Sequence, residues 1–442
     1  MKKINLHEDD LLAVHDRLMI IAIPGQHMLR PRRLRIAVVT ETYPPEVNGV
    51  ALTVLKLVQG LVARGHELQL VRARHHNEFP IDDRQDCANP SLVLCASLPI
   101  PKYPELRMGL PARRRLWELW SKRRPDVVHI ATEGPLGWSA LRLANSMGIP
   151  VSADFRTNFH AYSKHYGIGW LRRPIMSYLR HFHNLAQATF VPTEAMRKEL
   201  LSFHFNDLKV ISRGVDTVQF DPAKRSLSLR SAWQVNERTL VVLYVGRLAA
   251  EKNTQLLLAA FRAIQSKASN VRLVVVGDGP QRRALAEQFP TAFYAGMKTG
   301  ESLAQHYASA DLFLFPSLTE TFGNVTLEAL ASGLPVIAFN YAAAAAHVKP
   351  AHSGFLAELG REDHFIALAA GIATVPHRLV EMRVQAREAA IYLSWDRVVD
   401  EFETSLRKLS FRPGTTDVEQ LHPEAGRWNP MADASDAQQR RL

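Results

Sequence analysis

The clearest indication of the fold comes from residues 34–72, LRIAVVTETYPPEVNGVALTVLKLVQGLVARGHELQLVR. The first seven residues form a short apolar run, typical of a parallel strand that is buried on both faces. A loop rich in Pro, Gly and Asn follows at residues 42–49, and residues 50–64 carry apolar side chains at helical spacing. Gly65 is a helix stop, and residues 66–72 predict the next strand. The stretch therefore predicts a strand–turn–helix–strand unit of an α/β domain.

The same pattern continues along the chain and then restarts after residue 222. In the first half we predict further strands at 126–130, 150–153, 189–192 and 209–212, and in the second half at 239–245, 271–276, 291–294, 311–315 and 335–339. Alternating short strands and helices indicate a parallel sheet covered on both faces, present twice. The predicted fold class is therefore α/β, with two doubly wound, Rossmann-like domains, and ligands are expected in a cleft at the carboxyl ends of the strands.

Domain limits follow from the same pattern. We expect a first domain over residues 34–213, a linker over 214–222 and a second domain over 223–380. Residues 1–33 have no clear periodicity, so we expect a loosely ordered leader or a true start at Met28. Residues 412–442 are polar and contain proline, which predicts a disordered tail.

Composition excludes several classes of protein. The 442 residues are 47% hydrophobic and 22% charged, which is ordinary for a globular chain and excludes disorder and collagen. Cys87 and Cys95 match neither a disulfide framework nor a zinc spacing, so we expect a reducing, cytoplasmic compartment. The longest uncharged run, Ala329–Val348, is interrupted by glycine and proline and does not predict a membrane span.

The net charge of +11 is concentrated in the first half of the chain. Residues 1–220 hold 30 Lys and Arg against 20 Asp and Glu, and within them residues 101–124 hold eight basic side chains against Glu105 and Glu118. Together with Trp117, this bias fits docking on an anionic membrane surface, although a solubilising basic surface explains it equally well. Nucleic acid is a poorer partner, because no recognition helix or aromatic-lined basic sheet accompanies the charge.

The segment 316–333, PSLTETFGNVTLEALASG, carries the most chemical information. Glu320 lies on the loop beyond a predicted strand, and Glu328 lies about one turn inside the following helix. Gly323 allows the backbone to approach a ligand, and the free N–H groups at the helix start attract phosphate or sugar oxygens. A pair of glutamates so spaced is weak evidence alone, because loop and helix glutamates are common.

Two cations follow another strand end, in residues 242–253, VLYVGRLAAEKN. Arg247 and Lys252 suit a diphosphate, the arginine as a planar fork and the lysine as a point charge. In the first half, Gly49 occupies the equivalent strand-to-helix turn, where backbone N–H groups are able to meet the same phosphates. The coincidence of these features at the strand ends of two similar domains indicates a nucleotide-type ligand in the cleft.

These segments resemble the retaining glycosyltransferases of family 4, which have the GT-B fold. The resemblance covers about residues 34–408 and rests on TETYPPEVNGVALTV, PDVVHIATEGPLGWSAL, TNFHAYSKHYG, RGVDTVQFDP, VGRLAAEKN, GDGP and ETFGNVTLEALASG. The chain looks most similar to the GDP-mannose-dependent α-mannosyltransferase branch, whose relatives also glycosylate diacylglycerol-type lipids. The resemblance implies that the last helices, over residues 381–411, cross back onto the first domain.

The resemblance also implies roles for individual residues. Arg247 and Lys252 would hold the donor diphosphate, Glu320 the hydroxyls of the donor sugar and Glu328 the nucleotide ribose. Backbone amides around Phe322, Gly323 and Asn324 would support the sugar and phosphate, and Gly49 would approach the diphosphate from the opposite domain. No metal and no cofactor beyond the nucleoside diphosphate sugar is implied, because fixed cations and amides neutralise the leaving group.

One residue departs from the family pattern. Many relatives carry histidine near the transferred sugar where this chain has Arg156, which cannot act as a general base but is able to hold an anion or a sugar hydroxyl. His160 is a candidate acceptor-site residue that partly substitutes, or else a packing histidine. His129 reads better as a buried structural histidine, while Glu133 is a candidate contact to the acceptor.

The function implied is transfer of a hexose, mannose from GDP-mannose, to a lipid or saccharide acceptor at the cytoplasmic face of the membrane, by a peripheral enzyme of glycolipid biosynthesis. Two alternatives remain open at this point. One is transfer of glucose from UDP-glucose to diacylglycerol, and the other is a nucleotide-sugar-binding protein without transferase activity.

Overall fold

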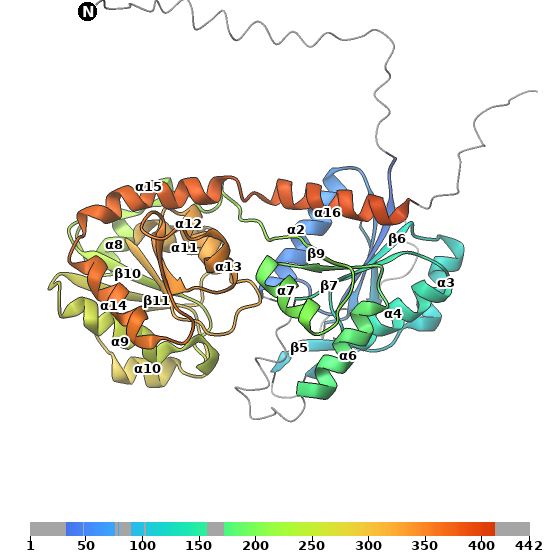
Figure 1. Ribbon diagram of the computed structural model, residues 1–442, viewed down its shortest axis with the longest axis horizontal. Coiled ribbons are helices and arrows are strands. Elements are labelled where there is room, and N and C mark those ends of the chain that lie inside the picture. Colours follow the sequence, from blue (N-terminus) through green and yellow to red (C-terminus); the bar gives the residue numbers. More distant parts are fainter. Residues whose placement is uncertain are drawn as a thin grey trace, which may run out of the picture.

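The computed structural model describes residues 32–46, 48–75, 78, 90–100, 103–156 and 172–411. The expectations for the leader up to residue 31, for His160 and for the tail from residue 412 lie outside these described residues. Two lobes, each built on one parallel sheet, lie side by side, and two helices run along the same side of both (Figure 1). The predicted fold class, two doubly wound domains, is confirmed.

The first domain contains a seven-stranded parallel sheet in the order β3-β2-β1-β6-β7-β8-β9. Its strands are β1 (Arg35–Thr40), β2 (Glu67–Ala73), β3 (Ser91–Cys95), β6 (Val127–Ile130), β7 (Val151–Asp154), β8 (Ala188–Val191) and β9 (Leu208–Val210). A separate antiparallel hairpin pairs β4 (Ser97–Ile100) with β5 (Tyr103–Gly109).

The second domain contains a six-stranded parallel sheet in the order β12-β11-β10-β13-β14-β15. Its strands are β10 (Leu240–Val245), β11 (Val271–Val276), β12 (Phe293–Gly296), β13 (Leu312–Phe315), β14 (Val336–Phe339) and β15 (Gly354–Ala357). In both sheets the order reverses beside the first strand, which creates the switch point where such sheets bind ligands.

Helices surround both sheets. In the first domain they are α2 (Gly49–Ala63), α3 (Arg113–Lys122), α4 (Pro135–Ser146), α6 (Arg172–Asn184) and α7 (Glu194–Ser202). In the second they are α8 (Leu227–Ala232), α9 (Thr254–Gln265), α10 (Arg282–Gln288), α11 (Gly300–Ser309), α12 (Asn324–Ala331), α13 (Ala342–His347), α14 (Glu362–Ala373) and α15 (His377–Ile391), followed by α16 (Trp395–Ser410).

Strands β3, β4, β5 and β15 were not among the sequence predictions. The start of β15 explains one omission, because a glycine at the head of a short run reads as a turn. In the structure, a Cβ on Gly354 would lie 2.0 Å from the carbonyl oxygen of Val336, so the strand needs glycine for close backbone pairing. Gly354 is therefore required by a contact between two strands and not by a local turn.

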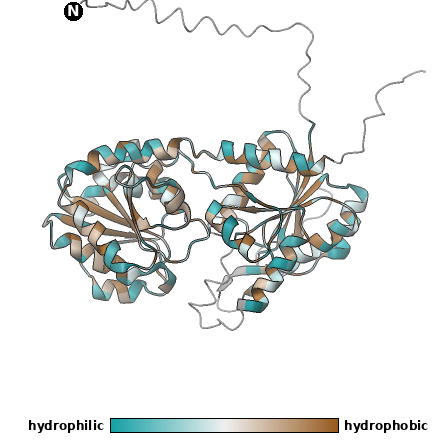
Figure 2. Cartoon of the chain, viewed as in Figure 1, coloured by the Kyte–Doolittle hydropathy of each residue, from teal (hydrophilic) through white to brown (hydrophobic). Residues whose placement is uncertain are grey.

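Alternate side chains of β1 enter two separate cores. Ala37 and Val39 pack on one face of the sheet with α3 and α4, whereas Ile36 and Val38 pack on the other face with α2 and α16. This is the two-residue repeat of a strand buried on both sides. Figure 2 shows the result, with apolar strands in the centre of each lobe and polar helix surfaces outside.

The chain crosses between the domains twice, and the crossings lie against each other. Val215 N–H donates to the carbonyl of Leu393 at 2.8 Å, and a Cβ on Gly214 would lie 2.8 Å from the backbone of Trp395. The structure corrects the expected boundary at residue 381, because Met382, in the middle of α15, is buried in the core of the second domain. The crossing therefore begins with α16, whose Phe402 is buried in the first domain.

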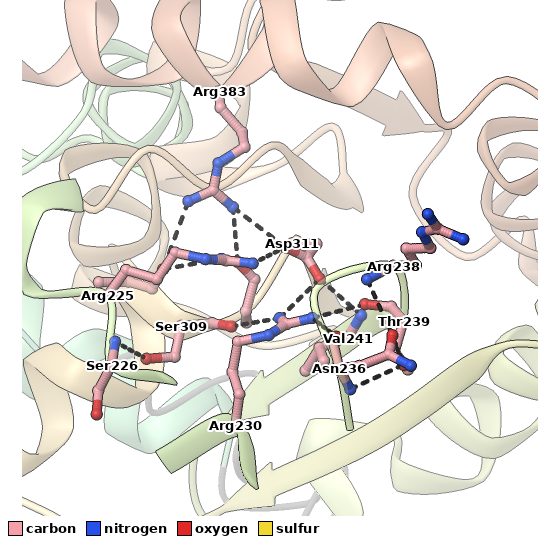
Figure 3. A network of polar contacts seen from close by, with 12 residues as sticks. Arg225, Ser226, Arg230, Asn236, Arg238, Thr239, Val241, Ser309, Asp311 and Arg383 are labelled. Atoms are coloured by element: carbon pink, nitrogen blue, oxygen red, sulfur yellow. Dashed lines mark hydrogen bonds and ion pairs between the residues drawn. The ribbon is translucent and has the colours of Figure 1, made fainter. Parts of the chain in front are cut away.

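Three arginines surround Asp311 at the amino-terminal edge of the second sheet (Figure 3). Arg225 and Arg230 contact its carboxylate at 3.0 and 3.1 Å, and Arg383 lies 3.6 Å from it. The same guanidinium groups donate to the carbonyls of residues 308–310, at the end of α11. The arginines therefore satisfy the free carbonyl groups at the end of α11. They also hold three segments of the chain together at the sheet edge opposite the carboxyl ends of the strands.

Within the described residues, no single helix is both long and apolar enough to cross a membrane. The pair α14 and α15 passes the same length and composition test together, but the two helices are bent by 112°.

Candidate functional site

Three loops meet at the carboxyl-terminal edge of the second sheet. They follow β10, β11 and β13, which are neighbours in the order β11-β10-β13 and run parallel. Their loops cover residues 246–253, 277–281 and 316–323. All the donor-binding residues expected in this domain lie on these loops or in the helix that follows the third one, so the fold brings them to one edge.

The glycine turn after β11 supports the loop after β10. A Cβ on Gly277 would lie 1.9 Å from the carbonyl oxygen of Gly246, and one on Gly279 would lie 2.4 Å from that of Leu248. Leu248 N–H in turn donates to the carbonyl of Asp278 at 2.9 Å. The two backbones are packed too closely for side chains, so this turn holds the cation-bearing loop in place.

Lys252 and Glu320 form an ion pair between two of these loops. Both side chains are 15% exposed, and Ser317 Oγ donates a second hydrogen bond to Glu320 Oε1 at 2.7 Å. Lys252 Nζ also lies 5.8 Å from the centre of the Phe315 ring. The cation expected for the diphosphate and the carboxylate expected for the sugar are therefore adjacent and held by fixed partners.

Arg247 lies on the same loop with an exposed side chain. Its backbone is anchored, because the hydroxyl of the buried Tyr244 donates to its carbonyl at 3.1 Å. The structure thus brings this second cation to the same sheet edge as Lys252, with its side chain on the solvent side.

Glu328 lies in the second turn of α12, behind the loop. Its Oε2 accepts a hydrogen bond from the hydroxyl of Tyr307 at 3.0 Å. Burial raises the pKa of Glu328 to about 7, because the hydrogen bond from Tyr307 offsets only part of the lost hydration. Further hydrogen bonds to this carboxyl group, such as those that ribose hydroxyls would donate, are therefore favourable.

The start of α12 is shaped by Gly323. This residue has φ +92°, in the left-handed region, and caps the helix at Asn324. The Phe322 ring is buried in the core, so this residue offers its backbone rather than its side chain to a ligand. The amino end of α12 thus lies next to Glu320, since a Cβ on Gly323 would be 3.5 Å from Glu320 Cγ.

Gly49 brings the first domain to the same place. It is the first residue of α2, whose cap Asn48 accepts from the N–H groups of Val50 and Ala51 at 3.1 and 2.9 Å. A Cβ on Gly49 would lie 3.4 Å from Asn324 Nδ2. The amino ends of α2 and α12, from different domains, therefore approach each other across the site.

Arg156 is buried beside an acid that was not among the predicted site residues. Its Nε donates to Asp154 Oδ2 at 2.5 Å, and its Nη2 forms an ion pair with the same oxygen. His129 Nε2 lies 3.1 Å from that oxygen as well, which agrees with a buried, bonded histidine. Burial would raise the pKa of Asp154, but the charges and hydrogen bonds of Arg156 and His129 lower it to about 2. The positive charge of Arg156 is thus compensated locally.

Arg213 is a second residue that the sequence analysis missed. It follows β9 in a segment that we read as the approach to the linker, yet the residue is only 7% exposed and its side chain reaches the other domain. Its Nη1 donates to Asn324 Oδ1 at 3.3 Å, and its guanidinium lies 5.6 Å from the centre of the Phe322 ring. Asp154 ends β7 and Arg213 lies three residues after β9, so both are at the carboxyl ends of strands of the first sheet, and this position is the signal that would have found them.

The expected acceptor residues are less closely tied to the donor loops. Glu133 is buried, with Oε1 3.4 Å from Nε2 of His183, and its backbone carbonyl accepts from the Tyr178 hydroxyl at 2.5 Å. Its contacts are therefore with α6 of its own domain. Nearby, Glu41 accepts from Leu136 N–H at 3.0 Å at the start of α4, and burial raises the pKa of Glu41 to about 7.

Comparison with protein families identifies both halves. The profile described as Glycosyltransferase Family 4 matches residues 47–219, and the profile described as Glycosyl transferases group 1 matches residues 239–374. A GDP-mannose-dependent alpha-mannosyltransferase of Mycobacterium tuberculosis is 35% identical over 372 residues, covering 83% of this chain and 95% of the relative. An alpha-monoglucosyldiacylglycerol synthase of Streptococcus pneumoniae is 29% identical, covering 69% of this chain and 71% of the relative.

Solved structures show the same architecture. A sucrose-phosphate synthase from Thermosynechococcus elongatus superposes with a TM-score of 0.72 at 20% identity, covering 85% of this chain and 99% of that one. HepE of Anabaena, in complex with UDP and glucose, superposes with a TM-score of 0.66 at 16% identity, covering 85% and 100%. These likenesses confirm the GT-B arrangement of two facing domains expected from the sequence.

Proposed function

Because the chain belongs to glycosyltransferase family 4, a family of retaining hexosyltransferases, we propose that it transfers mannose from GDP-mannose to a lipid or saccharide acceptor. The observation that carries this proposal is the convergence of Lys252, Glu320 and Glu328 at one sheet edge, opposite Gly49 of the other domain. The non-transferring alternative has less support, because these expected donor residues are present and held in place by hydrogen bonds.

The geometry supports a reaction without a strong protein base. The bond between the sugar C1 and the phosphate oxygen breaks, and its electron pair stays on the diphosphate. Arg247, Lys252 and the helix N–H groups stabilise that charge. The acceptor hydroxyl attacks on the same face of the sugar and passes its proton to the departing phosphate oxygen. Arg156, paired with Asp154, retains a positioning role beside this reaction.

GDP-mannose is the favoured donor because three mannosyltransferases named for it are 33–35% identical to this chain. A second candidate donor is UDP-glucose, with diacylglycerol as acceptor. The alpha-monoglucosyldiacylglycerol synthases favour it at 27–29% identity, and HepE was crystallised with UDP and with glucose. The lower identity of these relatives makes it the alternative.

We further propose that the acceptor is presented at the cytoplasmic face of a membrane, on which the enzyme docks peripherally through α3. In this helix Leu116 and Trp120 are buried, whereas the Arg114 side chain is 94% exposed and Trp117 is 55% exposed. A groove beside them is lined by Arg113, Arg114, Trp117, Leu143, Ser146 and Met147. Exposed arginines around an exposed tryptophan suit anionic lipid headgroups.

The first experiment is thermal stabilisation of the purified protein by GDP, UDP, ADP and their sugar conjugates. A ligand at a hundred times its Kd adds ~2.7 kcal/mol to the free energy of unfolding. Selective stabilisation by GDP and GDP-mannose, followed by mannose transfer into membrane lipids or oligosaccharides, would support the proposal. Selective stabilisation by UDP-glucose would favour the alternative, and no stabilisation by any of them would contradict both.

A further inference from the structure

Two arginines of the first domain are buried at the domain junction, and their environments differ. Arg156 is 8% exposed and is paired with Asp154 through two of its nitrogen atoms. Arg213 is 7% exposed, and no carboxylate within the described parts of the chain forms an ion pair with it. Its hydrogen bond goes to a neutral amide, Asn324 Oδ1. The charge of Arg213 is therefore buried without a counter-charge in contact.

A buried charge without a counter-charge destabilises the folded protein unless an anion binds beside it. Transfer of an uncompensated guanidinium from water is unfavourable, and the protein lowers the cost by pairing or by binding a ligand. The pKa of Arg213 reflects this, because burial and the nearby charge of Arg156 lower it to about 9. Asp154 and Glu320 act in the opposite direction but are not in hydrogen-bond contact with it.

The position of Arg213 indicates which kind of anion would bind beside it. A Cβ on Gly49 would lie 3.5 Å from Arg213 Nη1 and 3.4 Å from Asn324 Nδ2. Arg213 thus lies where the amino ends of α2 and α12 approach each other, so the positive ends of two helix dipoles lie beside it. A guanidinium between two helix amino ends is a site for a phosphate group.

We propose that Arg213 is a further donor-binding residue, which holds the diphosphate of the nucleotide sugar from the side of the first domain. The inference rests on the proposed function, since it assigns a role within the same site. During transfer, the C1–O bond of the sugar breaks and its electron pair remains on the β-phosphate oxygen. Arg213 stabilises that charge together with Lys252, so the leaving group is held by cations from both domains.

The geometry also explains why both domains must contribute. Lys252 is already paired with Glu320 from its own domain, and Arg156 with Asp154. Arg213 is the buried arginine at this junction whose bonds leave its charge uncompensated. A diphosphate bound there would contact groups of both domains.

Isothermal titration calorimetry tests this with nucleoside diphosphates and their nucleosides as probes. GDP, UDP and ADP are titrated into the wild-type protein, and the tightest of them is compared with its own nucleoside in Arg213→Gln. Loss of hydrogen bonds between charged groups predicts a fall in diphosphate affinity of about tenfold to a hundredfold, with nucleoside affinity unchanged. Arg283→Gln is the matched control, because this side chain is 92% exposed on α10, and we expect it to change neither affinity.

Arg213→Lys keeps the charge and provides a second test in case the glutamine variant does not fold. We expect its diphosphate affinity to lie between those of the wild type and Arg213→Gln. Unchanged diphosphate affinity in Arg213→Gln would overturn the inference while leaving the proposed function intact. Equal losses of nucleoside and diphosphate affinity, or equal losses in the lysine and glutamine variants, would also overturn it. A wild-type protein that binds none of the diphosphates would overturn both.

Discussion

Lys252 and Glu320 are paired across two loops that follow adjacent strands of the second sheet. Each neutralises the other, so neither charge is buried alone. A nucleotide sugar would divide the pair between its two ends, with the diphosphate taking the lysine and the sugar hydroxyls taking the glutamate. Under the proposed function, the ion pair places the groups for both parts of the donor side by side before the donor binds, which reduces the reorganisation needed on binding.

Removal of either partner is expected to reduce turnover severely. Lys252→Ala and Glu320→Gln should each lower kcat by about 10²- to 10³-fold, because each deletes a group that stabilises the transition state. Steady-state kinetics with the identified donor provides the measurement. The exposed Lys267 and Glu287, changed to alanine and glutamine, are the matched controls. Full activity in a correctly folded Lys252→Ala protein would contradict the site assignment.

Donor binding should depend on pH through Glu328. Its pKa is about 7 in the free site, and ribose hydroxyls that donate to the carboxylate would lower the pKa in the complex. Affinity for GDP-mannose should therefore be complete above pH 7 and should fall as the pH drops below it. Calorimetry between pH 5.5 and 8.5 tests this. We expect Glu328→Gln to bind more weakly and to lose the pH dependence, and a pH-dependent Glu328→Gln would exclude this carboxyl group as its source.

The arginine cluster around Asp311 should affect stability rather than chemistry (Figure 3). Asp311→Asn leaves Arg225, Arg230 and Arg383 without their shared carboxylate, and breaking such a pair costs about 3 kcal/mol. Denaturant unfolding should report this loss. Because the cluster is at the sheet edge remote from the site, kcat per folded molecule should stay unchanged. A large fall in kcat without a fall in stability would show that the two edges are coupled.

The contact between α2 and α16 yields a two-mutation test. A Cβ on Gly60 would lie 2.5 Å from Val399 Cγ2, so Gly60→Ala should destabilise the protein by about 1 kcal/mol or more. In a Val399→Ala background the two closest atoms are gone and only Cβ of residue 399 remains, at 3.2 Å, so the same change should cost much less, because the helix preference for alanine offsets the remaining tight contact. Thermal unfolding of the four proteins measures the coupling. Additive effects would mean that α16 does not pack on α2 as described.

Membrane docking through α3 predicts a specific loss of binding. Arg113→Gln with Arg114→Gln should weaken binding to vesicles that contain anionic phosphatidylglycerol by about 2 kcal/mol, or roughly thirtyfold. Trp117→Ala should weaken it further, whereas hydrolysis of the soluble donor should not change. Co-sedimentation with anionic and with purely zwitterionic vesicles gives the readout. Equal binding of the wild type to both vesicle types would exclude an electrostatic membrane site.

Much of the fold and of the donor site was predictable because it is encoded locally. Short apolar runs such as Leu34–Thr40 predict buried strands, and parallel strands place their following loops at one edge. The positions of Glu320 and Lys252 at that edge follow from chain order alone. The edge strand β15 did not follow, because its glycine serves a contact with Val336, far away in sequence.

Local sequence is therefore enough to predict most of the helices and strands and the chemistry of the donor loops. Which charges meet depends on how the two domains pack. Arg213 reaches Asn324 across 111 positions and the domain junction, and Asp154 compensates Arg156 instead of it. The final helix likewise completes the core of the first domain with Phe402. Such pairings depend on the packing of two domains against each other, and neither periodicity nor motif spacing contains that information, because both describe only neighbours along the chain.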